Sequence, residues 1–266
     1  MGADLANGCL RDGRLVCPLH GWEYDRNGEC VHVPALGRNR PSHWARQLRF
    51  PTIELGGQIF FFNELRPRFP APFFDGVSPF QLRAAGSFEL RDNVPWYFIG
   101  ANGFDVQHFR NAHDRVLLAE PIIDAPAPFA RRITLRLAVA GHSLGDRLTR
   151  LFAGPKLTMT VTVWAGTLIF VTARFRRAVS YGLMTVRPLE NEATHARVVV
   201  WVRRSASMLA QSSFDPVNLA LRRHFIRQFL RSDVGRMSGV RYTPSRLIEA
   251  DKPFADYMEW LRQIHS

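Results

Sequence analysis

Apolar and polar residues alternate most clearly over residues 157–164, which read Leu-Thr-Met-Thr-Val-Thr-Val-Trp. A period of two residues is typical of a strand with one buried and one more polar sheet face. Further runs of strand character occur at 133–140, 167–175, 181–187 and 196–203. The pattern therefore predicts an antiparallel sheet of about five strands in the C-terminal two-thirds of the chain.

The period becomes helical between residues 215 and 232. Leu219, Phe225 and Phe229 belong to a set of apolar residues at helical spacing, with arginines between them. Asp215-Pro216 predicts the start of this helix, because aspartate is a favoured N-cap and proline fits the first helical position. Two further helices are expected, one in the later part of 94–113 and one over 254–264.

The first seventy residues predict short strands joined by tight turns. Asp12-Gly13, Asn27-Gly28 and Gly56-Gly57 lie between strand-like runs, and such dipeptides favour hairpin turns. Prolines then interrupt a Phe-rich segment between residues 67 and 79, where we place a domain boundary. The sequence thus predicts an α+β protein with a small β domain at 1–70 and a larger domain at 80–266.

Composition supports a folded core. The chain has 266 residues, of which 46% are hydrophobic and 22% charged, and this balance argues against disorder and against a coiled coil. It contains no apolar run of the ~18 to 20 residues that a membrane span needs, and its N-terminus lacks the order of a signal peptide. We expect no membrane span and a cytoplasmic location.

The formal net charge of +12 comes mostly from arginine, since Lys156 and Lys252 are the only lysines. The arginines are spread along the whole chain, and the sequence has no zinc-finger or P-loop pattern, so we expect no nucleic-acid partner. A basic surface also steers acidic protein partners, among them small electron carriers.

Cys17 and His20 form a Cys-x-x-His pair in the string Cys-Pro-Leu-His-Gly-Trp. A thiolate and an imidazole three residues apart at the tip of a β-turn can reach one metal centre, and the neighbouring Pro and Gly stiffen the loop. The alternative is a buried free cysteine beside an unrelated histidine. All three cysteines lie in the first thirty residues, which favours a metal or redox role over a disulfide framework.

A second group combines Asp105, His108 and His113. Two imidazoles with a carboxylate are typical of sites that hold a divalent iron on one face and leave the other positions open. Histidines five apart on a helix point about 140° away from each other, so we expect them to share a metal only where the helix is widened or broken. The alternative is a pair of structural histidines. The His-Glu-x-x-His string of zinc hydrolases is absent.

Together, Cys-Pro-x-His-Gly-Trp and the later Asp-x-x-His-x-x-x-x-His resemble the terminal oxygenase component of Rieske non-haem iron oxygenases. The resemblance extends to the closing stretch 248–254 with Tyr257 and Trp260, and its closest branch acts on steroids and other bulky hydrophobic substrates. It implies a partial Rieske-type antiparallel β module followed by a helix-grip, START-like antiparallel sheet around a long C-terminal helix.

The resemblance also implies roles for single residues. Cys17 and His20 match the second Cys-x-x-His half of the Rieske [2Fe–2S] ligand set, in which two Cys bind one iron and two His the other. His108 and His113 match the histidines of a mononuclear Fe(II). The third iron ligand in the family is an aspartate on the long C-terminal helix, for which Asp233 fits best and Asp215 is the rival.

Asp105 matches the acid that links the Rieske histidine of one subunit to the iron histidine of its neighbour in homotrimers. The first Cys-x-His half of the cluster motif would lie immediately before Met1, so we expect the chain to begin inside the motif. Cys9 lacks a histidine two residues later, and Cys30-Val-His32 lies on the wrong side of Cys17.

The implied function is the oxygenase component of a Rieske-type system. Such a component hydroxylates or desaturates a hydrophobic, aromatic or steroid-like substrate with O₂ and electrons from a ferredoxin or flavin reductase. Two alternatives remain, because half of the cluster ligands are missing from the sequence. The chain could be a non-catalytic binder of hydrophobic ligands, or an inactive fragment.

Overall fold

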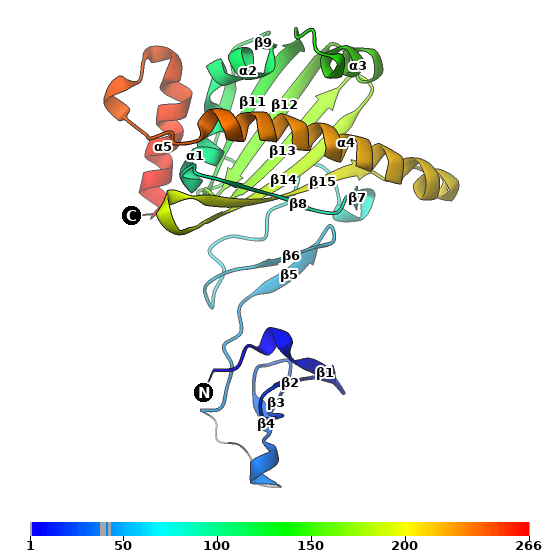
Figure 1. Ribbon diagram of the computed structural model, residues 1–266, viewed down its shortest axis with the longest axis vertical. Coiled ribbons are helices and arrows are strands. Elements are labelled where there is room, and N and C mark those ends of the chain that lie inside the picture. Colours follow the sequence, from blue (N-terminus) through cyan, green and yellow to red (C-terminus); the bar gives the residue numbers. More distant parts are fainter. Residues whose placement is uncertain (1, 38–40, 42–43, 266) are drawn as a thin grey trace. The chain divides into compact units, whose positions relative to one another are not determined.

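The computed structural model describes residues 2–37, 41 and 44–265 and divides the chain into two compact units. The first unit comprises Met1–Glu54 and Gln58–Ala71, and the second comprises Leu55–Gly57 and Pro72–Ser266. Figure 1 shows the elements of both units coloured along the sequence.

The first unit consists of short antiparallel strands and two 3₁₀ turns. A four-stranded sheet has the order β1-β2-β3-β4, and β5 pairs with β6 in a separate hairpin. Their bounds are β1 (Cys9–Arg11), β2 (Arg14–Val16), β3 (Glu23–Tyr24), β4 (Cys30–His32), β5 (Thr52–Leu55) and β6 (Gln58–Phe61), with 3₁₀ turns η1 (Leu5–Asn7) and η2 (Pro34–Leu36). Asp12 and Gly13 both have positive φ, of 49° and 74°, which confirms the hairpin turn predicted there.

The second unit is built on an antiparallel sheet that has nine strands within the described part of the chain. The order is β10-β11-β12-β13-β14-β15-β7, with β9 also on β11 and β8 also on β15. The bounds are β7 (Leu82–Ala84), β8 (Phe88–Asp92), β9 (Arg115–Leu117), β10 (Ile122–Asp124), β11 (Ala130–Val139), β12 (Lys156–Trp164), β13 (Leu168–Phe175), β14 (Val179–Pro188) and β15 (Thr194–Arg203). The five predicted strands are confirmed as β11 to β15.

Alternation along the central strands separates the two faces of this sheet. Val161 on β12 lies opposite Ile133 on β11, and both are buried in the main hydrophobic core. Thr160, one residue away, pairs with Thr134 on the other face, and both threonines are half-buried. A slip of one residue would place threonines in the core, so this pattern fixes the register.

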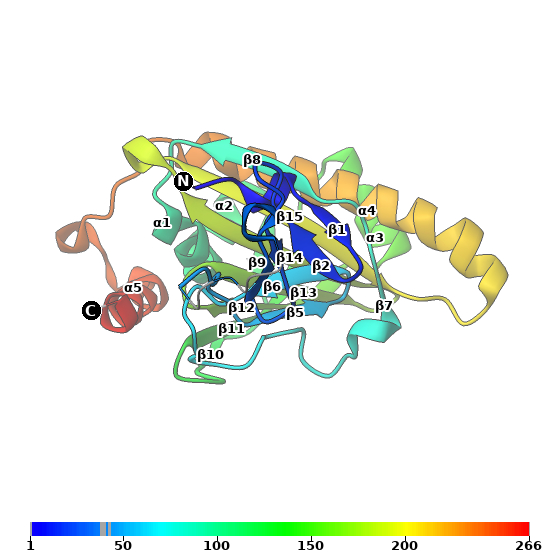
Figure 2. The ribbon, with the colours of Figure 1, turned by 90° about the horizontal axis from the view of Figure 1, so that it is seen from below.

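Helices cover the core face of the sheet. They are α1 (Trp96–Ala101), α2 (Val106–His113), α3 (Leu144–Phe152), α4 (Met208–Met237) and α5 (Lys252–His265), with 3₁₀ turns η3 (Pro79–Gln81), η4 (Asn102–Phe104), η5 (Glu190–Glu192), η6 (Pro244–Arg246) and η7 (Glu249–Asp251). The long α4 runs along β15 and β8, and α5 packs against α1 (Figure 1, Figure 2). Among the described residues, no helix is both long enough and apolar enough to cross a membrane.

The predicted start of the long helix at Asp215 is wrong. The helix begins at Met208, after Ser207, whose side chain caps it by accepting a hydrogen bond from the backbone amide of Ala210. Met, Leu, Ala and Gln at 208–211 are strong helix formers, so the helix extends ahead of the Asp-Pro pair. Pro216 is accommodated inside the helix, while Asp215 turns inward and accepts hydrogen bonds from Ser205.

Candidate metal centre

The two histidines of the second motif lie on one short helix that Asp105 starts. The Asp105 carboxylate is the N-cap of α2 and accepts a hydrogen bond from the backbone amide of His108 at 3.0 Å. The helix ends at His113, because Asp114 takes the left-handed conformation with φ 52° and ψ 43°. One histidine therefore lies in the first turn of α2 and the other at its last residue.

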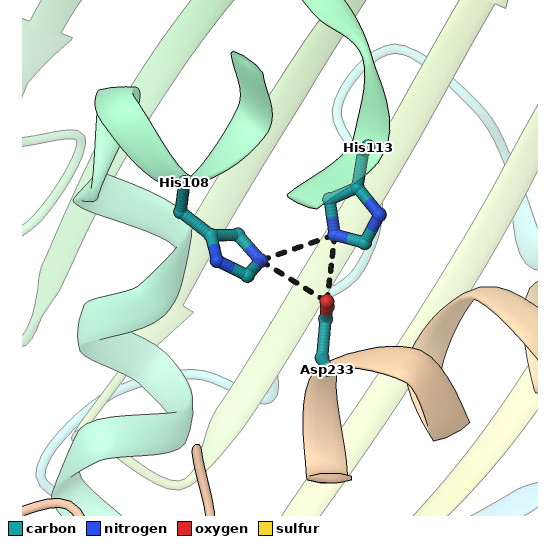
Figure 3. Close-up of side chains that lie close together, drawn as sticks. All are labelled: His108, His113 and Asp233. Carbon is teal, nitrogen blue, oxygen red and sulfur yellow. Dashed lines mark hydrogen bonds and ion pairs between the residues drawn. The ribbon is translucent and has the colours of Figure 1, made fainter. Parts of the chain in front are cut away.

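Asp233 of α4 meets both histidines, although 120 residues separate it from the nearer one (233 − 113). Its Oδ1 lies 3.1 Å from His108 Nε2 and 2.7 Å from His113 Nε2, and the two Nε2 atoms are 3.1 Å apart (Figure 3). The three side chains are 4% to 11% exposed. They form the one group of three or more His, Cys, Asp or Glu residues within metal-binding reach in the described parts of the chain.

These separations fit a three-ligand metal site. Two donors that bind one metal at right angles through bonds of about 2.1 Å lie about 3.0 Å from each other. The three observed distances between donor atoms, 2.7, 3.1 and 3.1 Å, lie within about 0.3 Å of that value. Donors on one triangular face leave the opposite positions open to other ligands, and two imidazoles with one carboxylate are the donor set of non-haem Fe(II) sites.

The expectation that α2 must be widened or broken between its histidines is wrong. The helix is α-helical from Val106 through His113. Each imidazole carries its Nε2 several Å out from the helix surface, and the two rings turn toward each other until their centroids are 4.8 Å apart. The reach of the side chains, rather than a distortion of the backbone, closes the angle between them.

Asp233 is held in its charged form. Burial alone would raise the pKa of this carboxyl, but hydrogen bonds and favourable charge interactions with His108 and His113 outweigh burial and keep the pKa below its ordinary value. A charged carboxylate facing two imidazole nitrogens is the form that binds a cation. The rival, Asp215, is equally buried but accepts its hydrogen bonds from the amide and hydroxyl of Ser205, away from the histidines.

Phe229 fixes the plane of one histidine ring. Its ring stacks on that of His113 with centroids 3.6 Å apart and an angle of 14° between the planes. Phe229 lies one helical turn before Asp233, so α4 presents an aromatic platform and a carboxylate on the same face. The sequence showed only a helical apolar position at 229, and its spacing of four from Asp233 was the available signal.

Two arginines tie down the end of α2. Arg115 donates one hydrogen bond to the His113 carbonyl at 2.7 Å and another to Asp146 at 2.8 Å, and Arg236 donates to the Ala112 carbonyl at 3.0 Å. The last carbonyls of a helix have no intrahelical partner and carry partial negative charge, so cations stabilise them. The sequence interpretation missed these residues; the Ser143-x-x-Asp146 cap signature and the position of Arg236 three residues after Asp233 were the signals.

Cys17 and His20 lie in the first unit, on the loop between β2 and β3. The loop is closed by hydrogen bonds from the Cys17 amide to the Trp22 carbonyl and from the Gly21 amide to the Cys17 carbonyl, with Gly21 at φ 69°. Cys17 is half-buried and His20 is exposed. A thiolate and an imidazole provide two of the four donors that a Rieske cluster takes.

The family comparison identifies the N-terminal part of the chain. Residues 1–52 match the sequence profile of the Rieske [2Fe-2S] domain. This match covers the β2–β3 loop with Cys17 and His20, and a domain of this kind holds an iron–sulfur cluster.

Two curated relatives are oxygenases. The chain is 37% identical over 78 residues to the aminopyrrolnitrin oxygenase PrnD of Pseudomonas fluorescens, an alignment covering 27% of this chain and 22% of that protein. It is 35% identical over 72 residues to a 3-ketosteroid-9-alpha-monooxygenase oxygenase component of Rhodococcus rhodochrous, covering 27% of this chain and 18% of the relative. The matched stretches thus span less than a quarter of each relative.

The fold has close counterparts among solved structures. One of them, the NdmA QL mutant of Pseudomonas putida CBB5 with theobromine, aligns with a TM-score of 0.68 at 20% identity and covers 98% of this chain and 74% of that one. At this level of identity the likeness establishes the fold. It agrees with the predicted helix-grip sheet around a long C-terminal helix.

Proposed function

Residues 1–52 match the Rieske [2Fe-2S] domain, two relatives are oxygenases, and the fold has counterparts among solved structures. We propose that the chain is the oxygenase component of a Rieske non-haem iron oxygenase and that its second unit binds a mononuclear Fe(II) through His108, His113 and Asp233. The observation that carries this proposal is the set of near-equal distances among the three donor atoms, from 2.7 to 3.1 Å. Iron bound there would supply O₂ activation for the hydroxylation or desaturation of a hydrophobic, aromatic or steroid-like substrate.

The surrounding residues hold the donors in place. The Asp105 cap fixes the backbone of His108, the Phe229 ring fixes the plane of His113, and Arg115 fixes the His113 carbonyl. Such supporting contacts orient metal ligands and are worth a factor of 10 to 100 in affinity in known sites. The three side chains are 4% to 11% exposed, so bulk water has little access to the donor atoms.

The first unit is proposed to serve electron delivery. Residues 1–70 form the partial Rieske domain and residues 80–266 the catalytic domain, and Cys17 and His20 are proposed to bind one iron each of a [2Fe–2S] cluster. A complete cluster needs two further donors beside these two. The proposed partners are a ferredoxin or flavin reductase and, through Asp105, neighbouring subunits of a homotrimer. The expected cytoplasmic location stays a prediction.

A nitric oxide titration tests the proposed iron site. Protein loaded anaerobically with Fe(II) is exposed to nitric oxide, and the high-spin iron–nitrosyl signal is measured by electron paramagnetic resonance. We expect about one such centre per chain, because three ligands on one face leave positions open. The signal should be lost in Asp233→Asn and kept in Asp215→Asn, which changes a buried aspartate of the same helix.

The pair of variants makes the test decisive. A wild-type protein without the signal, or one whose signal survives in Asp233→Asn, contradicts the assignment of the three ligands. Loss of the signal in Asp215→Asn with retained signal in Asp233→Asn would transfer the third ligand to the rival residue. Circular dichroism on each variant establishes that the helices remain folded.

A further inference from the structure

The amphipathic helix α3 exposes its apolar face. Leu144, Leu151 and Phe152 are 72%, 62% and 69% exposed, whereas the charged Asp146 is 8% exposed and bonded to Arg115 and Ser143. A surface helix ordinarily buries its apolar stripe and exposes its charges. On α3, three large apolar side chains are instead in contact with water.

A second apolar stripe lies on α4. Phe214, Val217, Leu221 and Phe225 recur at intervals of three and four residues, so they share one side of the helix. They are 61%, 62%, 50% and 40% exposed. The N-terminal turns of α4, which carry the first of them, extend past the edge of the sheet in both views of the ribbon (Figure 1, Figure 2).

The two stripes are continuous. A Cβ atom built on Gly145 of α3 would lie 3.6 Å from the ring of Phe225 on α4, so the first turn of α3 packs beside the end of the α4 stripe. We call the combined area the α3–α4 surface and define it by Leu144, Leu151, Phe152, Phe214, Val217 and Leu221. A contiguous exposed apolar area of this kind marks an interaction site.

The charges around this surface are positive. The two helices carry seven arginines, of which three are exposed and four half-buried, and three aspartates, Asp146, Asp215 and Asp233, which are all buried and hydrogen-bonded. Arg147 on α3 is exposed, and Arg177 lies at the end of α3, where its side chain donates to the Leu151 carbonyl. Neither helix exposes a carboxylate that would balance these cations.

We propose that the α3–α4 surface binds the surface of a lipid bilayer that contains anionic lipids. Exposed Leu and Phe side chains flanked by arginines are typical of interfacial helices, whose apolar face enters the boundary between headgroups and acyl chains while the cations contact anionic headgroups. A second copy of the chain would place arginines opposite arginines, which disfavours self-association through this surface. A nucleic-acid duplex presents mainly sugars and phosphates, so it would leave the six apolar side chains without apolar contacts.

Membrane binding would place the protein where hydrophobic compounds concentrate. This consequence rests on the proposed function, since it concerns the substrate of the iron site. The binding itself does not, because the surface contains none of the three metal ligands. The two proposals can therefore fail separately.

Vesicle flotation tests the proposal. The full chain, without added iron, is mixed with vesicles of phosphatidylcholine alone or of phosphatidylcholine with phosphatidylglycerol, at low and high salt. We expect flotation with the anionic vesicles, and less of it at high salt, where the attraction is screened. The double variants Leu151→Gln/Phe152→Gln and Phe214→Gln/Val217→Gln should each weaken binding at least about tenfold, because they remove apolar side chains from the contact.

The matched control is Phe80→Gln/Ile122→Gln, which changes two exposed apolar residues outside the α3–α4 surface, 88% and 57% exposed. It should float like the wild type. Absence of flotation with anionic vesicles at low salt overturns the proposal, as does equal weakening in the control. Size-exclusion chromatography with light scattering is run in parallel. An oligomer that dissociates in the surface variants, together with absent flotation, would assign the surface to a second copy of the chain instead.

Discussion

At the scale of single residues, the buried aspartates divide between one that faces the histidines of the candidate metal centre and two that anchor the fold. Asp233 faces two imidazole nitrogens, Asp146 faces Arg115, and Asp215 faces Ser205. Asp146 reaches the candidate metal centre indirectly, because Arg115 donates both to it and to the carbonyl of His113. Loss of the Asp146 charge would free Arg115 and loosen the residue that ends α2.

We therefore predict that Asp146→Asn weakens iron binding about 10- to 100-fold, the effect of losing a contact that orients a metal ligand. The measurement is a titration of the iron-free protein with Fe(II) or Co(II) under anaerobic conditions. Asp124→Asn is the control, because it disrupts an ion pair with Arg132 on the exposed part of β10 and β11. Unchanged iron affinity in Asp146→Asn, or an equal loss of affinity in Asp124→Asn, would show that Arg115 and Asp146 do not support the iron ligands.

At the scale of elements, α4 connects the sheet to the candidate metal centre. Asp215 near its start accepts hydrogen bonds from the amide and hydroxyl of Ser205, which follows the last strand, and Asp233 near its end reaches α2. The hydrogen bonds from Ser205, aided by the nearby charges of Arg83 and Arg204, keep the pKa of Asp215 below its ordinary value. The anchor is therefore strongest while this carboxyl is charged.

Asp215→Asn should lower the free energy of unfolding by about 1–3 kcal/mol at neutral pH, because it removes the charge from a buried, hydrogen-bonded acceptor. A group whose pKa is lower in the folded state stabilises above its unfolded pKa, about 3.9 for aspartate, and loses this contribution as the pH falls through the folded pKa. The difference between variant and wild type, measured by urea denaturation, should be constant near neutral pH and shrink below about pH 4. A difference in unfolding free energy between variant and wild type that grows toward acid pH would contradict a stabilising role of the charged Asp215.

The long elements could be predicted from the sequence because they carry enough residues for a period to show. Strands of eight to ten residues contain either a clear alternation, as in β12, or a long run of apolar and β-branched residues, as in β15, whereas β7, β9 and β10 have three residues each and show no pattern. The start of α4 was missed because Asp215 resembles an N-cap, and its inward turn toward Ser205 depends on tertiary structure. Local geometry also argued against His108 and His113 sharing a metal, and the resemblance to a family, rather than helical periodicity, paired them.

At the scale of the whole molecule, the family match and the candidate metal centre lie in different units. Residues 1–52 match the Rieske [2Fe-2S] domain, while His108, His113 and Asp233 belong to the second unit. The net charge of +12 has a local counterpart on α3 and α4, where every aspartate is buried and three of the seven arginines are exposed. The buried acids are bonded within the second unit, so they do not offset the exposed arginines at the surface of α3 and α4.

The most direct test of the central claim compares iron with acid-labile sulfide in anaerobically purified protein. A [2Fe–2S] cluster contains equal amounts of the two, so iron in excess of sulfide counts the mononuclear site whether or not a cluster is present. We predict an excess of about one iron per chain, absent in Asp233→Asn and retained in Asp215→Asn. Iron equal to sulfide in the wild type, or an excess that persists in Asp233→Asn, would contradict the assignment of His108, His113 and Asp233 as an iron site.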